Sequence, residues 1–268
     1  MVNIHKAYIG DNQKWLPKLT DKVQLVMTSP PYFNERDYST WATFEKYAED
    51  MRKVIQECYR LLDDGRIICW NVATLPKIDL SSYSSMWLQE AGFQFRDKII
   101  WCKPPSQSLR LATFNIHPYP MYYYPDNNYE EVLVYQKGTF KGHKKQNKID
   151  VVFKKEVLSS LWKINPVIKI NQFGVNKYGH IAPYPIDLPK RCIKLYSYSG
   201  ETVLDPFSGS FKTFEAARAT DRNSTSIELH KKYFDVIKPK LSFGNDFFGN
   251  NKYEVFYDEY KEGNRNKQ

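Results

Sequence analysis

Two short segments of the chain carry residue types that could do chemistry. The first is Thr28-Ser29-Pro30-Pro31-Tyr32, which directly follows the apolar run Val23–Met27. Its two prolines fix their φ angles near −65° and remove two amide donors, so the backbone is rigid and its carbonyls are free to accept hydrogen bonds. The Ser29 hydroxyl and the Tyr32 ring stand beside them. Together they suit a planar group that carries an amine, and a plain strand-to-loop turn is the alternative.

The second segment is Asp205-Pro206-Phe207-Ser208-Gly209-Ser210, between an expected strand and an expected helix. A turn of small residues at this place lets a ligand approach the backbone at a helix N-terminus. Glu228 ends the next expected strand, at the spacing that suits a ribose diol. The pyrophosphate-binding pattern GxGxxG is absent, which favours a nucleoside over a dinucleotide. A turn without any ligand is the alternative.

The elements that must position these segments alternate between strand-like and helix-like patterns, which is typical of an α/β sheet. We expect strands over 3–9, 23–27, 66–70, 93–102, 131–135, 202–204, 226–229 and 253–257. We expect helices over 44–62, 80–91, 189–198, 211–220 and 231–241, the first of them ended by Asp63-Asp64-Gly65. Residues 104–129 are expected to form a long loop. Residues 138–180 show little periodicity and are expected to form a small insertion.

The positive charge of the chain is concentrated in one place. The 268 residues carry a net charge of +9, and the segment from Lys137 to Lys155 holds seven lysines against one acid, Asp150. Such a cluster could follow the phosphates of a nucleic acid, and a solvated loop is the alternative.

Composition excludes several classes of protein. Hydrophobic residues at 42% and charged residues at 26% rule out a disordered chain. No apolar run approaches the roughly 18 residues that a membrane helix needs, and the first residues lack a secretory signal pattern. The four cysteines have no metal-ligand spacing and are expected to be reduced core residues. We therefore expect a cytoplasmic protein with no metal and no membrane partner.

Taken together, the two motifs resemble those of the DNA methyltransferases that methylate exocyclic amines. That family carries [D/N/S]-P-P-[Y/F/W] as its catalytic signature and a D-P-F-x-G-S-G-type turn for S-adenosylmethionine. Here TSPPY precedes DPFSGS, a circularly permuted order that resembles the beta group. The segments LLDDGRIICWN, DKIIWCKP, YEEVLVYQK and HIAPYP extend the resemblance over most of the chain. One departure is Phe211, which stands where the family has a small residue.

The resemblance implies a single catalytic domain over 1–268 with a Rossmann-like methyltransferase fold. Its sheet would be seven-stranded and mostly parallel, with an antiparallel hairpin strand among the seven, and 138–180 would be an inserted target-recognition region. The implied catalytic residues are Ser29, Pro30, Pro31 and Tyr32. The implied cofactor-binding residues are Asp205, Pro206, Phe207, Ser208, Gly209, Ser210, Glu228, Asp11 and Pro183. The implied DNA-binding residues are Lys141, Lys144, Lys145 and Lys148.

The resemblance also implies the reaction. A base flipped out of double-stranded DNA would enter the TSPPY segment and receive a methyl group from S-adenosylmethionine. Serine at position 29 resembles the cytosine-N4 enzymes, whereas aspartate is found mostly in the adenine-N6 enzymes. We therefore expect cytosine-N4 methylation in a restriction–modification system, by a monomer or weak dimer with a cognate endonuclease encoded nearby. The alternatives are adenine-N6 methylation and a DNA-binding regulator with a degenerate cofactor site.

Overall fold

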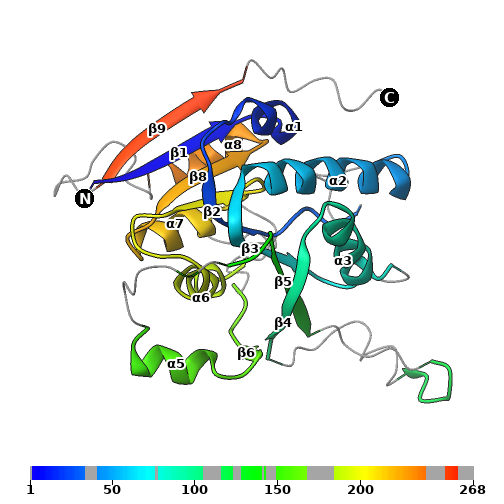
Figure 1. Ribbon diagram of the computed structural model, residues 1–268. Helices are drawn as coiled ribbons and strands as arrows, with labels where there is room; N and C mark the ends of the chain where they lie inside the picture. Colours follow the sequence, from blue (N-terminus) through cyan, green and yellow to red (C-terminus); the bar gives the residue numbers. More distant parts are fainter. Residues whose placement is uncertain are drawn as a thin grey trace.

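A nine-stranded sheet organises the described part of the chain in the computed structural model (Figure 1). The structure describes residues 2–33, 41–75, 78–104, 116–122, 128–140, 142, 149–167, 184–239 and 251–258. The strand order is β6-β4-β5-β3-β2-β7-β8-β1-β9. The strands are β1 (Asn3–Ile9), β2 (Val23–Thr28), β3 (Leu62–Val72), β4 (Gln94–Cys102), β5 (Tyr129–Gln136), β6 (Leu161–Lys163), β7 (Thr202–Asp205), β8 (Asn223–Glu228) and β9 (Asn251–Tyr257).

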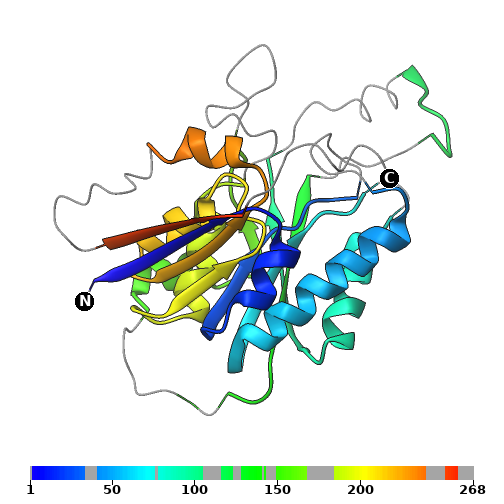
Figure 2. The same ribbon diagram turned by 90° about the horizontal axis from the view of Figure 1, so that it is seen from above.

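Helices cover both faces of this sheet (Figure 2). They are α1 (Asn12–Trp15), the 3-10 turn η1 (Leu16–Lys18), α2 (Phe44–Leu61), α3 (Leu80–Glu90), α5 (Val151–Val157), α6 (Asp187–Tyr196), α7 (Lys212–Arg218) and α8 (Lys231–Ile237). Core residues of η1, α2 and α3 pack on one face, and those of α6 and α7 pack on the other. The strands between them alternate their side chains, so β3 sends Ile68 and Trp70 to the first face and Ile67 and Cys69 to the second.

The direction of the strands gathers both motifs at one edge. Within the described sheet only β5 runs antiparallel to its neighbours, β3 and β4, and every other pairing is parallel. The carboxyl ends of β1, β2, β3, β4, β7 and β8 therefore meet at the same edge as the beginning of β5. Ligands of open α/β sheets bind at this edge.

The predicted fold class is confirmed, and the strand count differs from the predicted seven. Eight of the nine strands correspond to strands expected from the sequence, and the edge strand β6, which pairs with β4, is the one that the pattern did not predict. The region predicted as a small insertion thus contributes the helix α5 and an edge strand of the main sheet. β6 has only three residues, too few to show a period in the sequence.

The helix expected over 44–62 ends within one residue of its predicted end, but Asp63-Asp64-Gly65 do not form a break between this helix and the next strand. The helix α2 ends at Leu61, and the three residues belong to β3. Gly65 adopts φ +75°, and its amide donates to the carbonyl of Lys137 at 2.6 Å. A Cβ at this position would lie 2.8 Å from Cα of Phe140, so the strand requires glycine here.

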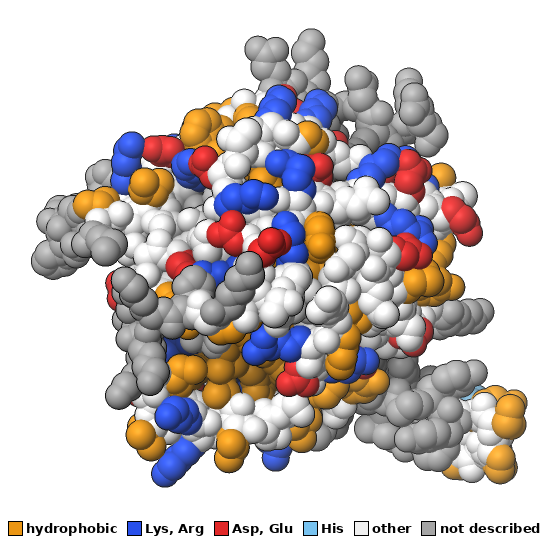
Figure 3. All heavy atoms as spheres, in the orientation of Figure 1, with side chains coloured by type: hydrophobic (Ala, Val, Ile, Leu, Met, Phe, Trp, Pro, Cys, Tyr) orange, Lys and Arg blue, Asp and Glu red, His pale blue; other side chains and the backbone are white. Residues whose placement is uncertain are grey.

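Charges of both signs are interspersed over the face of the molecule shown in Figure 3. The ion pairs of the molecule include the exposed pair of Arg52 with Glu90 and the largely buried pair of Arg66 with Glu201. Among the described residues, no helix has the length and apolar character needed to cross a membrane. The four cysteines are unpaired, and three of them, Cys58, Cys69 and Cys192, are buried, as predicted.

Candidate active site

Asp205 lies at the centre of the edge where the two motifs meet. Its side chain is fully buried at the end of β7. Oδ1 accepts hydrogen bonds from Thr28 Oγ1 at 2.6 Å and from the Phe207 amide at 3.1 Å, and Oδ2 accepts from the Tyr184 hydroxyl at 3.3 Å. Burial raises the pKa of this carboxyl above its usual value, and these donors oppose the rise. The donors therefore fix the carboxylate in place.

Glu228 ends the neighbouring strand β8, and its role as a ribose-binding carboxylate stays a prediction. Its two oxygens accept from the amides of Gly209 and His230, both at 2.8 Å. Burial is the main cause that raises the pKa of this carboxyl to about 7. Each oxygen keeps a lone pair for a ligand, because a carboxylate can accept about four hydrogen bonds and the two amides use two.

The turn between these acids, residues 206–210, is held from several sides. The Ser208 amide donates to the Ile227 carbonyl at 2.9 Å, and Ser208 Oγ donates to the Asp205 carbonyl at 3.1 Å. Gly209 takes φ +48°. These hydrogen bonds within the protein hold the shape of the turn.

The N-terminal segment after β1 lies against the same turn. The Gly10 amide donates to the Glu228 carbonyl at 2.8 Å, and Asn12 Nδ2 donates to the Pro206 carbonyl at 3.1 Å. Asp11 Oδ1 accepts from the Gln13 amide and caps α1. Asp11 thus lies beside the turn and begins a helix, and its part in cofactor binding stays a prediction.

Phe211 directs its ring away from this turn. The residue adopts a left-handed conformation with φ +59° and precedes α7. Its buried ring packs in a separate cluster with Phe214, Phe234 and the β1 residues Ala7 and Ile9. The large residue therefore fills a core rather than the space over the turn.

Ser29, Pro30, Pro31 and Tyr32 follow the end of β2. Ser29 Oγ accepts a hydrogen bond from Asn71 Nδ2 at 3.2 Å, and the Pro31 carbonyl accepts one from the Tyr47 hydroxyl at 3.0 Å. The half-buried Tyr32 packs against the core cluster of α2 and α3, and its hydroxyl donates to Glu130 Oε2 at 3.0 Å. Burial raises the pKa of Tyr32 well above its usual value, so the hydroxyl stays a donor.

The two motifs are joined through Thr28 and Tyr184. Thr28 ends β2 directly before Ser29, and its hydroxyl reaches Asp205 at the end of the neighbouring strand β7. The Tyr184 hydroxyl also contacts Thr213 Oγ1 at 2.5 Å, which links the turn to α7. The sequence prediction did not assign Thr28 or Tyr184 to the site. Their only sequence signal was their place inside TSPPY and HIAPYP.

Asn71, Glu130 and Lys103 are further polar residues that the sequence prediction missed. They lie where β3 ends, where β5 begins and directly after β4. Their signal was positional, since each belongs to a strand end at the ligand-binding edge. Pro183 and the four predicted DNA-binding lysines, Lys141, Lys144, Lys145 and Lys148, lie outside the described residues.

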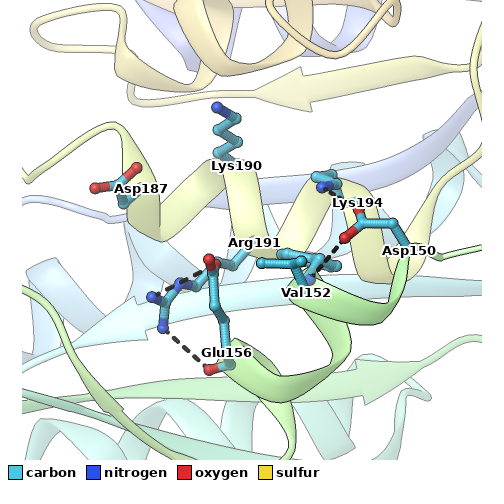
Figure 4. A pocket seen from close by; sticks show the side chains of 8 residues that line it. Asp150, Val152, Glu156, Asp187, Lys190, Arg191 and Lys194 are labelled. Carbon is cyan, nitrogen blue, oxygen red and sulfur yellow. Dashed lines mark hydrogen bonds and ion pairs between the residues drawn. The ribbon is translucent and has the colours of Figure 1, made fainter.

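A groove of about 410 Å³ separates α5 from α6, away from both motifs (Figure 4). Its lining holds three acids and three bases. Lys194 pairs with Asp150 at 3.3 Å and Arg191 with Glu156 at 3.9 Å, so the groove is balanced in charge. Within the described residues no group of His, Cys, Asp and Glu could hold a metal ion.

The donor set at the edge fits S-adenosylmethionine. Glu228 presents acceptors suited to a ribose diol, and Asp205 adds a second negative charge beside it, which suits a cofactor with a sulfonium and an ammonium group. The sheet topology, together with the TSPPY segment beside the turn 206–210, defines an S-adenosylmethionine-dependent methyltransferase fold. The chain belongs to the DNA methylase family whose enzymes methylate N6 or N4, because residues 23–239 match the model of that family. S-adenosylmethionine is the methyl donor of this family, as predicted.

Relatives in sequence agree with this family. The chain is 31% identical to the type II beta methyltransferase M.BslI of Bacillus sp. (strain NEB-606) over an alignment of 252 positions, which covers 88% of the chain and 27% of M.BslI. It thus spans about a quarter of that relative. It is 26% identical to the type II methyltransferase M.MjaI of Methanocaldococcus jannaschii over an alignment of 280 positions, which covers 88% of the chain and 91% of M.MjaI.

Solved structures share the fold. The Thermus thermophilus protein TTHA0409, in complex with S-adenosyl-L-methionine, superposes with a TM-score of 0.70 at 21% identity and covers 95% of this chain and 100% of its own. The cytosine-N4-specific PvuII DNA methyltransferase superposes with a TM-score of 0.69 at 18% identity and covers 91% of this chain and 88% of its own.

Proposed function

We propose that this chain transfers a methyl group from S-adenosylmethionine to the N4 amine of a cytosine flipped out of double-stranded DNA. The observation that carries the proposal is the 2.6 Å hydrogen bond from Thr28 to Asp205, because it joins the start of the TSPPY segment to the residue that precedes the turn 206–210. Serine at position 29, which resembles the cytosine-N4 enzymes, favours cytosine over adenine.

In this proposal residues 29–32, which we call the base slot, position the flipped base. The Pro30 carbonyl and the Ser29 hydroxyl accept hydrogen bonds from the exocyclic amine and localise its lone pair. Tyr32 stacks on the base. The cofactor supplies an electrophilic methyl group, and direct displacement by the amine needs no covalent enzyme intermediate. Catalysis then comes mainly from holding two substrates in line.

Asp205, the turn 206–210 and Glu228 would bind the cofactor, together with Asp11 and Pro183. Region 138–180 would dock the DNA, with Lys141, Lys144, Lys145 and Lys148 on phosphates, which position the enzyme without reading sequence. The type II names of the relatives support a place in a restriction–modification system with a partner endonuclease.

Mass spectrometry of nucleosides from DNA treated with the protein and cofactor tests the choice of base. We expect N4-methylcytosine, and N6-methyladenine alone would replace the cytosine assignment by the adenine one. Single-molecule sequencing of DNA from expressing cells would give the modified motif.

The alternative of a regulator with a degenerate cofactor site rested on Phe211. Its ring lies in a core cluster, which removes the steric reason for a defective site. Calorimetry with S-adenosylmethionine tests the alternative, since absent binding together with absent methyl transfer would favour the regulator.

A further inference from the structure

Glu130, the second residue of β5, contacts several polar residues around the base slot. Its Oε2 accepts hydrogen bonds from Asn71 Nδ2 at 2.6 Å and from the Tyr32 hydroxyl at 3.0 Å. Its Oε1 accepts from Lys103 Nζ at 2.5 Å. Asn71 Nδ2 also reaches Ser29 Oγ at 3.2 Å. The Glu130 carboxylate therefore contacts Tyr32 of the base slot directly and Ser29 through the Asn71 amide.

The register of the strands brings these groups together. Glu130 lies opposite Trp101 in the β4–β5 ladder, and the Lys103 amide donates to the Asn128 carbonyl, so Lys103 is the diagonal neighbour of Glu130 on the same face. The Lys103 ammonium also lies 4.8 Å from the centre of the Trp101 ring. The register of β4 with β5 and the contact of Lys103 with the Trp101 ring therefore keep the Lys103–Glu130 ion pair in place.

This pair differs from the surface ion pairs of the molecule. The Lys103 and Glu130 side chains are 25% and 12% exposed, so solvent screens their attraction less than it screens an exposed pair. Removing the hydrogen-bond donors of a carboxylate in such a place is destabilising, because the carboxylate then remains desolvated and unpaired.

The orientation of the Asn71 amide depends on Glu130. Asn71 is fully buried, and its Oδ1 has no hydrogen-bond partner among the described residues. Only Nδ2 makes bonds, to Glu130 and Ser29. The reverse orientation would set Oδ1 against the Glu130 carboxylate, so the negative charge fixes which atom faces Ser29.

We infer that Glu130, held by Lys103, is a positioning residue that fixes the Tyr32 ring and the Asn71 amide, and through Asn71 the Ser29 hydroxyl, for the amine of the flipped base. The residue at position 29 is neutral in this chain, and the fixed negative charge of the slot comes from β5 instead. This inference rests on the proposed function, since it assigns a role within the same base slot.

Counting acceptors predicts the effect of Glu130→Gln. The carboxylate serves three donors with two oxygens, whereas glutamine offers one oxygen and an NH₂ group. If that oxygen serves Tyr32 and Asn71, the NH₂ faces the Lys103 ammonium, and donor meets donor. We expect kcat to fall roughly 10²-fold, the effect of a misplacement of about 1 Å at a reacting centre.

The double variant Lys103→Met/Glu130→Gln separates positioning from charge. Removing the ammonium lets the glutamine oxygen serve Tyr32 and Asn71 without the clash, so the double variant should be at least tenfold more active than Glu130→Gln. A double variant as inactive as Glu130→Gln would overturn the positioning role.

The experiment measures single-turnover methyl transfer on DNA that contains the methylation site, the KM for that DNA, and S-adenosylmethionine binding by calorimetry. The stoichiometry of cofactor binding counts the folded molecules in each preparation. For Glu130→Gln we expect the fall in kcat given above, while the cofactor affinity and the KM for DNA stay within about threefold of wild type. Lys103→Met alone provides a second variant should Glu130→Gln fold poorly, and it should lower kcat as well.

Glu131→Gln is the matched control. Glu131 is the next residue of β5, faces the opposite side of the sheet and pairs with Lys98 at 2.8 Å. It should transfer methyl groups at the wild-type rate. Wild-type activity in Glu130→Gln and Lys103→Met, with an active wild-type enzyme, would overturn this inference alone. A wild-type protein that methylates no DNA base would instead overturn the proposed function.

Discussion

The Thr28 hydroxyl donates a hydrogen bond of 2.6 Å to Oδ1 of Asp205, which joins the last residue of β2 to the last residue of β7. These residues are 177 positions apart in the chain and belong to different motifs. Because both are buried at strand ends, the bond fixes the distance between the base slot and the cofactor turn. A methyl transfer needs such a fixed distance, since the reacting atoms must meet at about 3–3.5 Å.

Thr28→Val should weaken both stability and cofactor binding. It removes the strongest donor to a buried carboxylate, which costs about 1–3 kcal/mol in stability. Loss of this donor should also raise the pKa of Asp205 further, since the hydroxyl opposes the effect of burial. Urea unfolding and calorimetry measure the two effects. Thr28→Ser keeps the hydroxyl and should resemble wild type, and equal losses in both variants would contradict the role of this bond.

Ser29→Ala should separate catalysis from cofactor binding. The change removes the acceptor of Asn71 Nδ2 and the proposed acceptor of the base amine. We expect kcat to fall by roughly 10²-fold or more while S-adenosylmethionine binds with unchanged affinity. Tyr32→Ala should behave in the same way because its ring would no longer stack on the base. Normal turnover in both variants would exclude the TSPPY segment as the reaction site.

The elements with clear periodicity could be predicted from the sequence. The helix α2 matches its predicted range to within one residue because seven buried residues recur on one face. The strand β1 ends in the apolar residues Ala7, Tyr8 and Ile9, the strand β2 is mostly apolar, and both lie where predicted. A short edge strand such as β6 has no period to detect.

The arrangement of the candidate site could be predicted where residues form a contiguous motif or keep a characteristic spacing from one. TSPPY and DPFSGS lie together at the expected edge, and Glu228 joins them at the end of β8. Glu130 could not be found in this way. It meets Tyr32 across 98 positions, and the meeting depends on β5 running antiparallel, which places its first residues among the carboxyl ends of its neighbours.

The combined change Lys144→Ala/Lys145→Ala should weaken DNA binding and its salt dependence. Each phosphate contact contributes about 0.9 to the slope of log K against log salt, so losing two contacts should flatten the slope by about 2. Fluorescence anisotropy at several salt concentrations measures this slope. Lys46→Ala/Lys53→Ala is the control, because these lysines pair with Glu49 on the surface of α2. An unchanged slope in the first variant would exclude those lysines from the DNA interface.

Phe211 combines a strained backbone with a buried ring, and two substitutions separate these properties. Phe211→Ala loses the packing, at about 3–5 kcal/mol, and keeps the left-handed backbone with φ +59°. Phe211→Gly loses the same packing but adopts this conformation freely, so it should be about 1 kcal/mol more stable than the alanine variant. Urea unfolding measures the difference. Equal stability of the two variants would show that the turn carries no such strain.

The pKa of Glu228, raised to about 7, predicts opposite pH dependences for cofactor affinity and stability. The ionised carboxylate offers acceptors to both ribose hydroxyls, so affinity for S-adenosylmethionine should be constant above pH 7 and fall up to tenfold per pH unit below it. Stability changes the other way. The unfolded carboxyl ionises near its usual value, so the folded state loses stability as the pH rises towards 7, by roughly 3 kcal/mol in total.

Calorimetry between pH 6 and 8.5 tests the effect on affinity, and urea unfolding between pH 5 and 8 tests the effect on stability. Glu228→Gln should bind the cofactor more weakly at pH 8, because an amide offers one acceptor and one donor group, and its affinity should hardly vary with pH. Glu131→Gln, which changes a carboxylate at a distant strand, should keep the wild-type dependence. An affinity of the wild-type protein that does not vary between pH 6 and 8.5 would contradict the assignment of Glu228 to the ribose.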